Sequence, residues 1–148
     1  MNYDNQMSMK FKSVPENEAF ARTSTSVFIT PLNPTLDELN DVKTAVSEAV
    51  TNAIIHGYEN DLGEVFLECG IKSNTIYIKI EDKGKGIENI EQAMSPLYTS
   101  KPNLGRSGLG FTVMESFMDE VSVSSKVGEG TIVEMKKTII GGNLDDSL

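Results

Sequence analysis

The chain has 148 residues, of which 39% are hydrophobic and 24% are charged, and its net charge is −9. This is the composition of one folded domain, and the acidic balance argues against direct nucleic-acid binding, which needs basic patches. The single cysteine, Cys69, excludes an internal disulfide and favours a buried core thiol in a reducing cytoplasm. No apolar segment approaches the roughly 18 residues of a membrane span, so we expect no membrane contact and no secretory signal.

The first two expected elements are a strand and a helix. Apolar and polar side chains alternate over residues 7–12, which is a weak strand signal. Pro15, followed by two glutamates, favours a helix that runs from there toward Pro31. The middle of this helix, residues 22–26, is rich in hydroxyl groups. It predicts either a solvated face or a docking surface anchored by Arg22.

The second helix has the clearest boundaries. Thr35 and Glu38 form a capping box at its start, and Gly57 is typical of a C-terminal cap. Apolar residues recur at steps of three and four, which predicts a face toward the core. This face consists of Leu36, Leu39, Val42, Val46, Ala49 and Ala53.

A polar stripe lies on the same helix. Glu48, Asn52 and His56 follow one another at steps of four, so they share one side of the helix. Because a helix this apolar should be largely buried, we expect the stripe to face a cleft, a ligand or a partner. For His56, packing or capping beside Gly57 is favoured over a chemical role.

Two hairpins are expected in the second half of the chain. Residues 65–71 and 76–81 alternate between apolar and polar side chains around a turn, which predicts antiparallel strands packed against the second helix. Residues 121–135 form a similar pattern around the turn at 126–130. We therefore expect one domain over residues 1–140 and a flexible tail over 141–148, where the sequence becomes polar.

Between the hairpins lie a glycine turn and a long basic loop. Asp82 ends a strand and is followed by Gly84, Gly86 and Ile87, where the backbone can approach a ligand closely. After a short helical piece near residues 90–94, the loop over residues 95–107 is irregular and carries two basic side chains. A loop this long inside a compact domain is usually functional or disordered.

The loop ends in a second glycine pair. Ser107, Gly108, Leu109 and Gly110 open a third helix that should run to about Met118. Free N–H groups and the helix dipole make such a helix start an anion-binding site.

Each of these pieces is weak alone, but their order fits one nucleotide site. Asp82 at a strand end can accept the exocyclic amine of adenine, and the two glycines that follow let base and ribose pack against backbone. Asn52 offers Mg²⁺ a neutral oxygen. Glu48, one turn earlier, can take a proton from a hydroxyl nucleophile. The helix start at Gly108 would bind phosphates, and Lys101 or Arg106 could cover the terminal one.

The motifs also resemble a known superfamily. Glu48-x-x-x-Asn52 with His56-Gly57, Asp82-x-Gly84-x-Gly86, the run 107–110 and Gly130-Thr131 match, in order, the boxes of the ATPases that include gyrase B, Hsp90, histidine kinases and MutL. The longer strings over residues 17–22, 48–58 and 96–102 resemble the anti-sigma F factors of spore-forming Firmicutes.

The resemblance implies a fold and an activity. The fold would be an α/β (α+β) two-layer sandwich, with a mixed, mostly antiparallel sheet and helices on one face. The activity would be that of a dimeric ATP-dependent serine kinase that inhibits the sporulation sigma factor F and phosphorylates a small anti-anti-sigma factor. Its cofactors would be ATP or ADP and Mg²⁺.

The resemblance also implies roles for single residues. Glu48 and Arg106 would be catalytic, Asn52 would hold Mg²⁺, and Arg22 would contact a partner. Nucleotide binding would involve Asn52, Asp82, Gly84, Gly86, Ile87, Thr99, Ser100, Lys101, Ser107, Gly108, Leu109, Gly110 and Thr131. Two alternatives stay open. They are an anti-sigma kinase for a stress-response sigma factor and a nucleotide-gated binding module without kinase activity. The catalytic domain of a histidine kinase is disfavoured, because the sequence offers no separate helix with an acceptor histidine.

Overall fold

The structure is a computed structural model, and it describes residues 1–59, 62–94 and 110–142. Five strands form one sheet in the order β1-β2-β3-β5-β4, and the four neighbouring pairs are antiparallel. The strands are β1 (Asn5–Lys12), β2 (Glu64–Lys72), β3 (Thr75–Asp82), β4 (Glu120–Lys126) and β5 (Gly130–Thr138).

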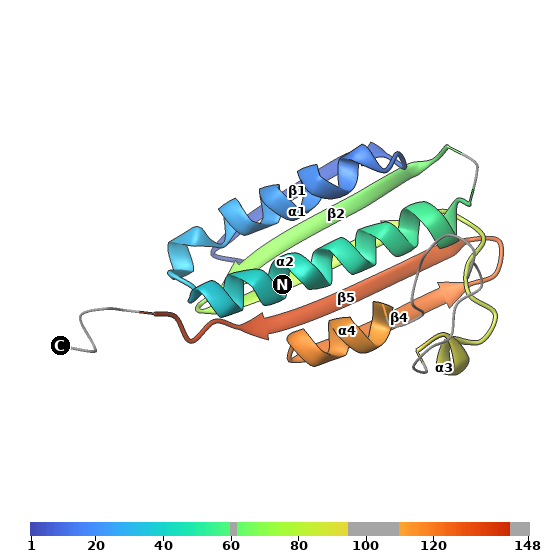
Figure 1. Cartoon of the computed structure of the whole chain (residues 1–148). Coiled ribbons are helices and arrows are strands. Elements are labelled where there is room, and N and C mark those ends of the chain that lie inside the picture. Colours follow the sequence, from blue (N-terminus) through green and yellow to red (C-terminus); the bar gives the residue numbers. More distant parts are fainter. Residues whose placement is uncertain (60–61, 95–109, 143–148) are drawn as a thin grey trace.

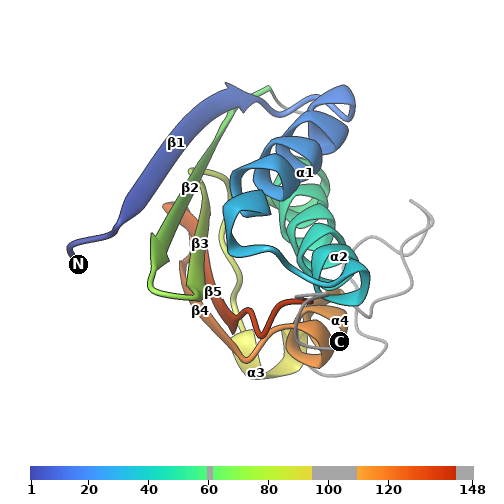
Figure 2. The ribbon, with the colours of Figure 1, turned by 90° about the vertical axis from the view of Figure 1, so that its left-hand side faces the viewer.

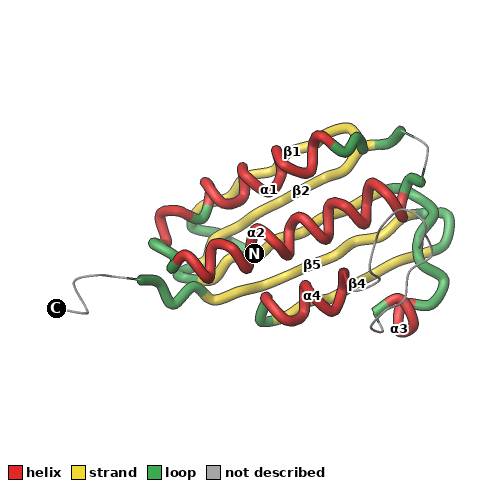
Figure 3. The backbone as a smooth tube through the Cα atoms, viewed as in Figure 1, coloured by secondary structure: helices red, strands yellow, loops and turns green. Residues whose placement is uncertain are grey.

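The helices form a second layer. Figure 1 shows α1, α2 and α4 lying over one face of the sheet, and the turned view in Figure 2 places them on the same side of it. They run along the strands rather than across them (Figure 3). The helical elements are α1 (Glu16–Phe28), η1 (Thr30–Leu32), α2 (Leu36–Asn52), η2 (Ala53–Gly57), α3 (Ile90–Ala93) and α4 (Gly110–Phe117). The predicted two-layer fold is therefore confirmed, and the sheet is antiparallel between all of its described neighbours.

The core lies between α2 and the inner face of the sheet. On β3, Ile76, Ile78 and Ile80 are at most 2% exposed, and they face the buried stripe of α2. Each fully buried side chain of this size stabilises the fold by about 1.5–3 kcal/mol. Cys69 pairs with Ile78 across the sheet and is fully buried, as predicted. Burial raises the pKa of its thiol to about 12, so it stays protonated at neutral pH.

The start of α2 confirms the capping box and corrects one core residue. The Glu38 amide donates to Thr35 Oγ1 at 3.0 Å, and the Thr35 amide donates to Glu38 Oε1 at 2.9 Å. Leu36, however, is 72% exposed, so its assignment to the core face was wrong. As the first residue of α2 it lies before the point where the helix meets the sheet.

Glu38 also holds the C-terminal segment. Its carboxylate accepts the amide hydrogens of Ile140 at 2.7 Å and Gly141 at 3.0 Å. The Gly142 amide donates to the Asn33 carbonyl at 3.0 Å. The rest of the predicted tail lies outside the described residues.

The hydroxyl-rich middle of α1 is not uniformly solvated. Thr25 is fully buried, and its hydroxyl donates to the Ala21 carbonyl at 2.9 Å, which satisfies it inside the core. The expectation of a solvated or docking face is therefore wrong at this position. Among the described residues no helix has both the length and the apolarity needed to cross a bilayer.

Candidate functional site

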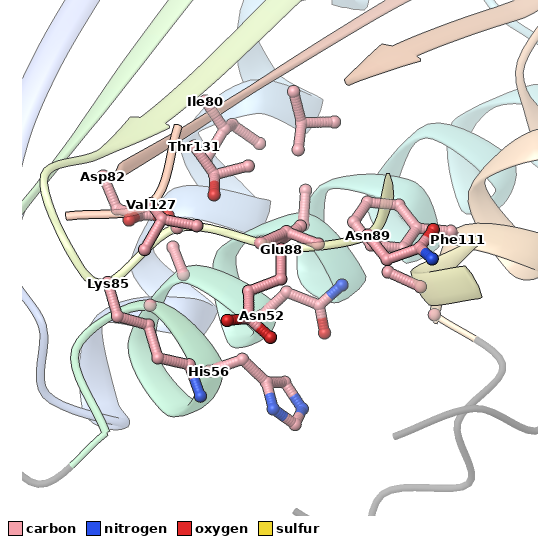
Figure 4. Close-up of a pocket in the computed structure, with 18 of the residues that line it drawn as sticks. Asn52, His56, Ile80, Asp82, Lys85, Glu88, Asn89, Phe111, Val127 and Thr131 are labelled. Atoms are coloured by element: carbon pink, nitrogen blue, oxygen red, sulfur yellow. The ribbon is translucent and has the colours of Figure 1, made fainter. Parts of the chain in front are cut away.

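A cavity of about 400 Å³ opens at one end of the sandwich, within the size range of small-molecule sites. Its walls come from the end of α2, from η2, from the segment after β3 and from the start of α4. Figure 4 shows Asp82 and Thr131 on the strand side, with Asn52 and His56 on the helix side. The lining residues are Ala49, Asn52, Ala53, His56, Gly57, Ile80, Asp82, Lys85, Gly86, Ile87, Glu88, Asn89, Gln92, Ala93, Gly110, Phe111, Val127, Thr131 and Val133.

The strand side of the cavity contains a buried carboxylate. Asp82 is 5% exposed, and burial raises the pKa of its carboxyl from 3.8 to about 6. Two backbone amides partly offset this, because Gly84 N–H donates to Oδ1 at 2.9 Å and the Thr131 amide donates to the same carboxylate. The carboxylate is ionised at neutral pH and can accept a hydrogen bond from a ligand donor.

Close backbone contacts explain two of the predicted glycines. A Cβ on Gly84 would lie 2.0 Å from the Gly57 carbonyl oxygen, which the Lys85 amide also meets at 2.9 Å. Gly86 has φ +78°, and a Cβ there would lie 2.3 Å from the Lys126 carbonyl oxygen. Only glycine fits at both positions. Gly84 thus allows the turn to pack closely against the end of η2, whereas Gly86 lines the cavity.

The helix that carries the polar stripe changes its winding at the cavity. Residues Ala53–Gly57 form a π-helical turn, in which the Tyr58 amide donates to the Ala53 carbonyl at 3.2 Å. Single π turns inside α-helices often occur at functional sites. Here the wider turn follows Asn52 directly, and both Asn52 and His56 line the cavity.

The polar stripe meets the start of α4. A Cβ on Gly110 would lie 3.0 Å from Asn52 Nδ2 and 3.2 Å from Glu48 Oε2, so this glycine leaves room between the two helices. Glu48 itself is not among the residues that line the cavity. An amide oxygen and a carboxylate that converge on one helix start are suitable for a ligand with a donor or a bound cation.

The donor set is compatible with Mg²⁺ held together with a phosphate. Mg²⁺ prefers oxygen ligands, and in nucleotide sites it commonly takes one or two from the protein and others from phosphates and water. Asn52 offers such an oxygen beside Glu48. No cluster of three or more histidine, cysteine or carboxylate side chains suited to a metal occurs in residues 1–59, 62–94 and 110–142.

The structure brings six of the predicted site residues into the cavity lining. They are Asn52, Asp82, Gly86, Ile87, Gly110 and Thr131. Glu48 and Gly84 lie next to it, as described above. Arg22 lies elsewhere, on α1, where its Nε donates to Glu18 Oε2 at 2.8 Å. The predictions for Thr99, Ser100, Lys101, Arg106, Ser107, Gly108 and Leu109 fall outside the described residues.

Several lining residues were not among the predicted site residues, although for Lys85 the sequence favours a solvated turn and a phosphate contact equally. Lys85 sits between the two motif glycines and forms an ion pair with Glu59 at 2.9 Å. Phe111 directly follows Gly110 and provides an apolar wall, while Val127 reaches the cavity from the β4–β5 turn. The position of Phe111 next to a glycine motif was a usable signal. No signal in the sequence pointed to Val127, because its turn lies near Asp82 only once the sheet has folded.

Comparison with known proteins agrees with this geometry. The family model described as histidine kinase-like ATPase domain matches residues 11–137. Among solved structures, the chain resembles the RsbU and RsbW domains of Rv1364c from Mycobacterium tuberculosis, with a TM-score of 0.66 at 14% identity, covering 91% of this chain and 32% of that one. It also resembles full-length ShkA in complex with AMPPNP, with a TM-score of 0.56 at 14% identity, covering 84% and 31% of the two chains. At this identity the likeness concerns the fold alone.

Relatives of similar length are much closer in sequence. The anti-sigma F factor of Clostridium beijerinckii is 62% identical over 135 residues, covering 90% of this chain and 94% of that protein. The anti-sigma F factor of Clostridium kluyveri is 60% identical over 135 residues, covering 91% and 95%. That of Anoxybacillus flavithermus is 57% identical over 134 residues, covering 90% and 92%. The chain therefore belongs to the anti-sigma F factor family, and its fold is that of a histidine kinase-like ATPase domain.

Proposed function

We propose that this protein is an anti-sigma factor that inhibits sigma factor F and is also an ATP-dependent serine kinase. One observation carries the kinase part: Glu48 and Asn52 meet the start of α4 at a cavity of about 400 Å³ whose opposite side holds the buried Asp82. Both the ATPase family match and the relatives named anti-sigma F factor support the proposal.

Nucleotide binding uses the two sides of the cavity. The ionised Asp82 accepts the amine of adenine, while apolar side chains such as Ile87 and Phe111 cover the base. Asn52 and Gly110, on the helix side, lie where the phosphates would reach. By resemblance, Lys101 and Arg106 would cover the terminal phosphate, although both lie outside the described residues.

The chemistry is phosphoryl transfer to a serine hydroxyl. Glu48 takes the proton of the hydroxyl as its oxygen bonds to the γ-phosphorus. The bond from that phosphorus to the β–γ bridging oxygen breaks, and ADP leaves with the bond's electron pair. Asn52 would hold Mg²⁺, which when bound would neutralise charge on the phosphate oxygens.

The acceptor serine would belong to an anti-anti-sigma factor, as the family resemblance implies. The surface proposed for this partner and for sigma factor F is the outer side of α1. There Arg22 is half-buried and pairs with Glu18, while Phe20, 55% exposed, and Val27, 66% exposed, point to another side of the same helix. The protein would act as a homodimer in the cytoplasm, where its thiol at Cys69 stays reduced.

The test is phosphorylation of the anti-anti-sigma factor with labelled ATP by wild type and Glu48→Gln. Removing a general base typically costs a factor of about 10² to 10⁴ in rate, so we expect at least about a hundredfold loss with ADP affinity retained. Glu115→Gln on the exposed side of α4 is the matched control and should behave as wild type. Full activity in Glu48→Gln would remove Glu48 from the base role.

Two alternatives are separated by related measurements. A protein that binds ATP and sigma factor F but transfers no phosphate to any anti-anti-sigma factor would be a nucleotide-gated binding module. Pull-downs from sporulating and stressed cells distinguish sigma factor F from a stress-response sigma factor, since only one of the two should be recovered.

A further inference from the structure

Ser125 is a hydrogen-bonding centre behind the cavity. It lies on β4, opposite Thr131 in the β4–β5 ladder, and is not itself part of the lining. Its hydroxyl oxygen has three polar contacts. The Ile87 amide donates to it at 2.7 Å, the Gly130 carbonyl oxygen lies at 3.0 Å, and Thr131 Oγ1 lies at 2.8 Å.

The valence of these groups fixes the direction of each hydrogen bond. A serine hydroxyl has one hydrogen and two lone pairs. The Ile87 amide can only donate and the Gly130 carbonyl can only accept. Ser125 therefore gives its hydrogen to Gly130, and its second lone pair accepts the hydroxyl hydrogen of Thr131. This is the one arrangement in which all three contacts are hydrogen bonds.

The consequence is that Thr131 presents only an acceptor to the cavity. Its hydrogen is engaged by Ser125, which leaves the lone pairs of Oγ1 available on the cavity side that Thr131 lines. Thr131 is 8% exposed, and its amide donates to the Asp82 carboxylate. Two hydrogen-bond acceptors, Asp82 and Thr131, thus lie side by side at the strand side of the cavity.

On the basis of the nucleotide-binding function proposed above, we propose that Ser125 is a positioning residue that sets the preference for adenine. Paired acceptors match the 6-amino group of adenine and repel the 6-oxo group of a hypoxanthine or guanine base. A site whose buried acceptors pair with donors on one ligand rejects a ligand that presents acceptors there, because the facing acceptors are left unpaired. Without Ser125, the Thr131 hydroxyl is free to rotate and donate to a 6-oxo group.

The experiment measures ADP and IDP affinity by titration calorimetry. IDP carries an oxygen in place of the amino group and keeps the ribose and phosphates. Ser125→Ala should weaken ADP binding by about fivefold to tenfold, the loss expected for one hydrogen bond, and should change IDP binding little or improve it. The dissociation constant for IDP divided by that for ADP should therefore fall by at least about fivefold.

Three further variants make the result specific. Ser124→Ala, at the exposed neighbouring position, should keep both affinities. Ser125→Thr retains a hydroxyl and should keep the ratio of wild type. Ser125→Cys nearly keeps the side-chain volume with a much weaker acceptor, so it should lower the ratio even if Ser125→Ala does not fold.

The outcomes separate this proposal from the function on which it rests. An unchanged ratio in folded Ser125→Ala or Ser125→Cys overturns the role of Ser125, whether both affinities fall equally or neither does. Wild-type protein that binds ADP in preference to IDP still supports nucleotide binding in that case. If wild type binds neither nucleotide, the proposed function fails and the role of Ser125 fails with it.

Discussion

Two carboxylates at opposite ends of the sandwich show how position decides the state of one chemical group. Burial raises the pKa of Glu38 at the start of α2, but backbone amides from Thr35, Ile140 and Gly141 outweigh it, so the net pKa is lowered. Burial dominates at Asp82, where Gly84 and Thr131 are the donors within the described part of the chain, and its pKa rises to about 6. The Glu38 carboxylate accepts three backbone amides that hold the fold together. The Asp82 carboxylate accepts two and lines the cavity, where it can also accept a ligand donor.

The largest effect that tests this contrast is expected from Asp82→Asn. The raised pKa means that the fold favours the protonated carboxyl. Its contribution to stability is complete below pH 3.8 and is lost as pH rises through about 6. The difference between 3.8 and about 6 corresponds to about 3 kcal/mol. The amide introduced by Asp82→Asn is neutral at every pH, so this variant should be more stable than wild type by up to about 3 kcal/mol at pH 8 and nearly equal at pH 4.

Denaturant unfolding of nucleotide-free protein at both pH values measures this gain. The same variant should bind ADP at least about tenfold more weakly, because a hydrogen bond to a charged acceptor contributes about 1.5–3 kcal/mol. A stability difference that is the same at pH 4 and pH 8 would show that burial does not govern this carboxylate.

Glu38→Ala should have a smaller effect of the opposite sign. It removes the capping partner of Thr35 and the acceptor for the Ile140 and Gly141 amides, so we expect a loss of about 1–2 kcal/mol at pH 7. Because the folded pKa is lowered, this contribution is present above the ordinary value of 4.5 and is lost as pH falls through the folded pKa.

Asp37→Ala is the control for this variant, since it removes a first-turn carboxylate without a capping role. Urea unfolding at pH 7 and pH 3 provides the comparison. If Glu38→Ala and Asp37→Ala lost equal unfolding free energy, Glu38 would act only through its negative charge near the helix start and not through its hydrogen bonds.

The smallest effect is expected from Leu36→Ala. Leu36 is 72% exposed, so truncating it should change the unfolding free energy by no more than about 0.5 kcal/mol. Val46→Ala on the buried face of the same helix is the contrast, because deleting a buried branched side chain leaves a cavity and costs roughly 1 kcal/mol or more. Thermal unfolding of both variants measures this. If Leu36→Ala lost as much unfolding free energy as Val46→Ala, Leu36 would have to be counted as a core residue.

Local signals in the sequence were sufficient for most of the fold. The period-two pattern of β2 and β3 and the capping box at Thr35 act over a few residues, and both are confirmed. The prediction that Leu36 belongs to the core failed because periodicity shows which side of a helix is apolar but not at which residue the sheet begins to cover that side. The π turn at Ala53–Gly57 was also missed. The carbonyl of Gly57, its last residue, accepts the Lys85 amide from a distant segment, and no local pattern contains such a contact.

The site was predictable to the extent that its groups follow a motif. Asp82, Gly86 and Thr131 were found from their order along the chain and do meet at the cavity. Val127 and Ser125 carry no motif, because their importance arises only when the β4–β5 hairpin is placed beside β3. The walls and supports of a site are defined by sheet pairing, which single-sequence patterns do not contain.

The buried carboxylate at Asp82 also has a consequence for how long the protein survives in a cell. At neutral pH it weakens the ligand-free fold, and any ligand that binds only the folded chain restores stability as its free concentration rises above its dissociation constant. Proteases act on the opened fraction of a population. The turnover of this chain should therefore slow when a nucleotide that binds this cavity is abundant and quicken when that nucleotide is scarce.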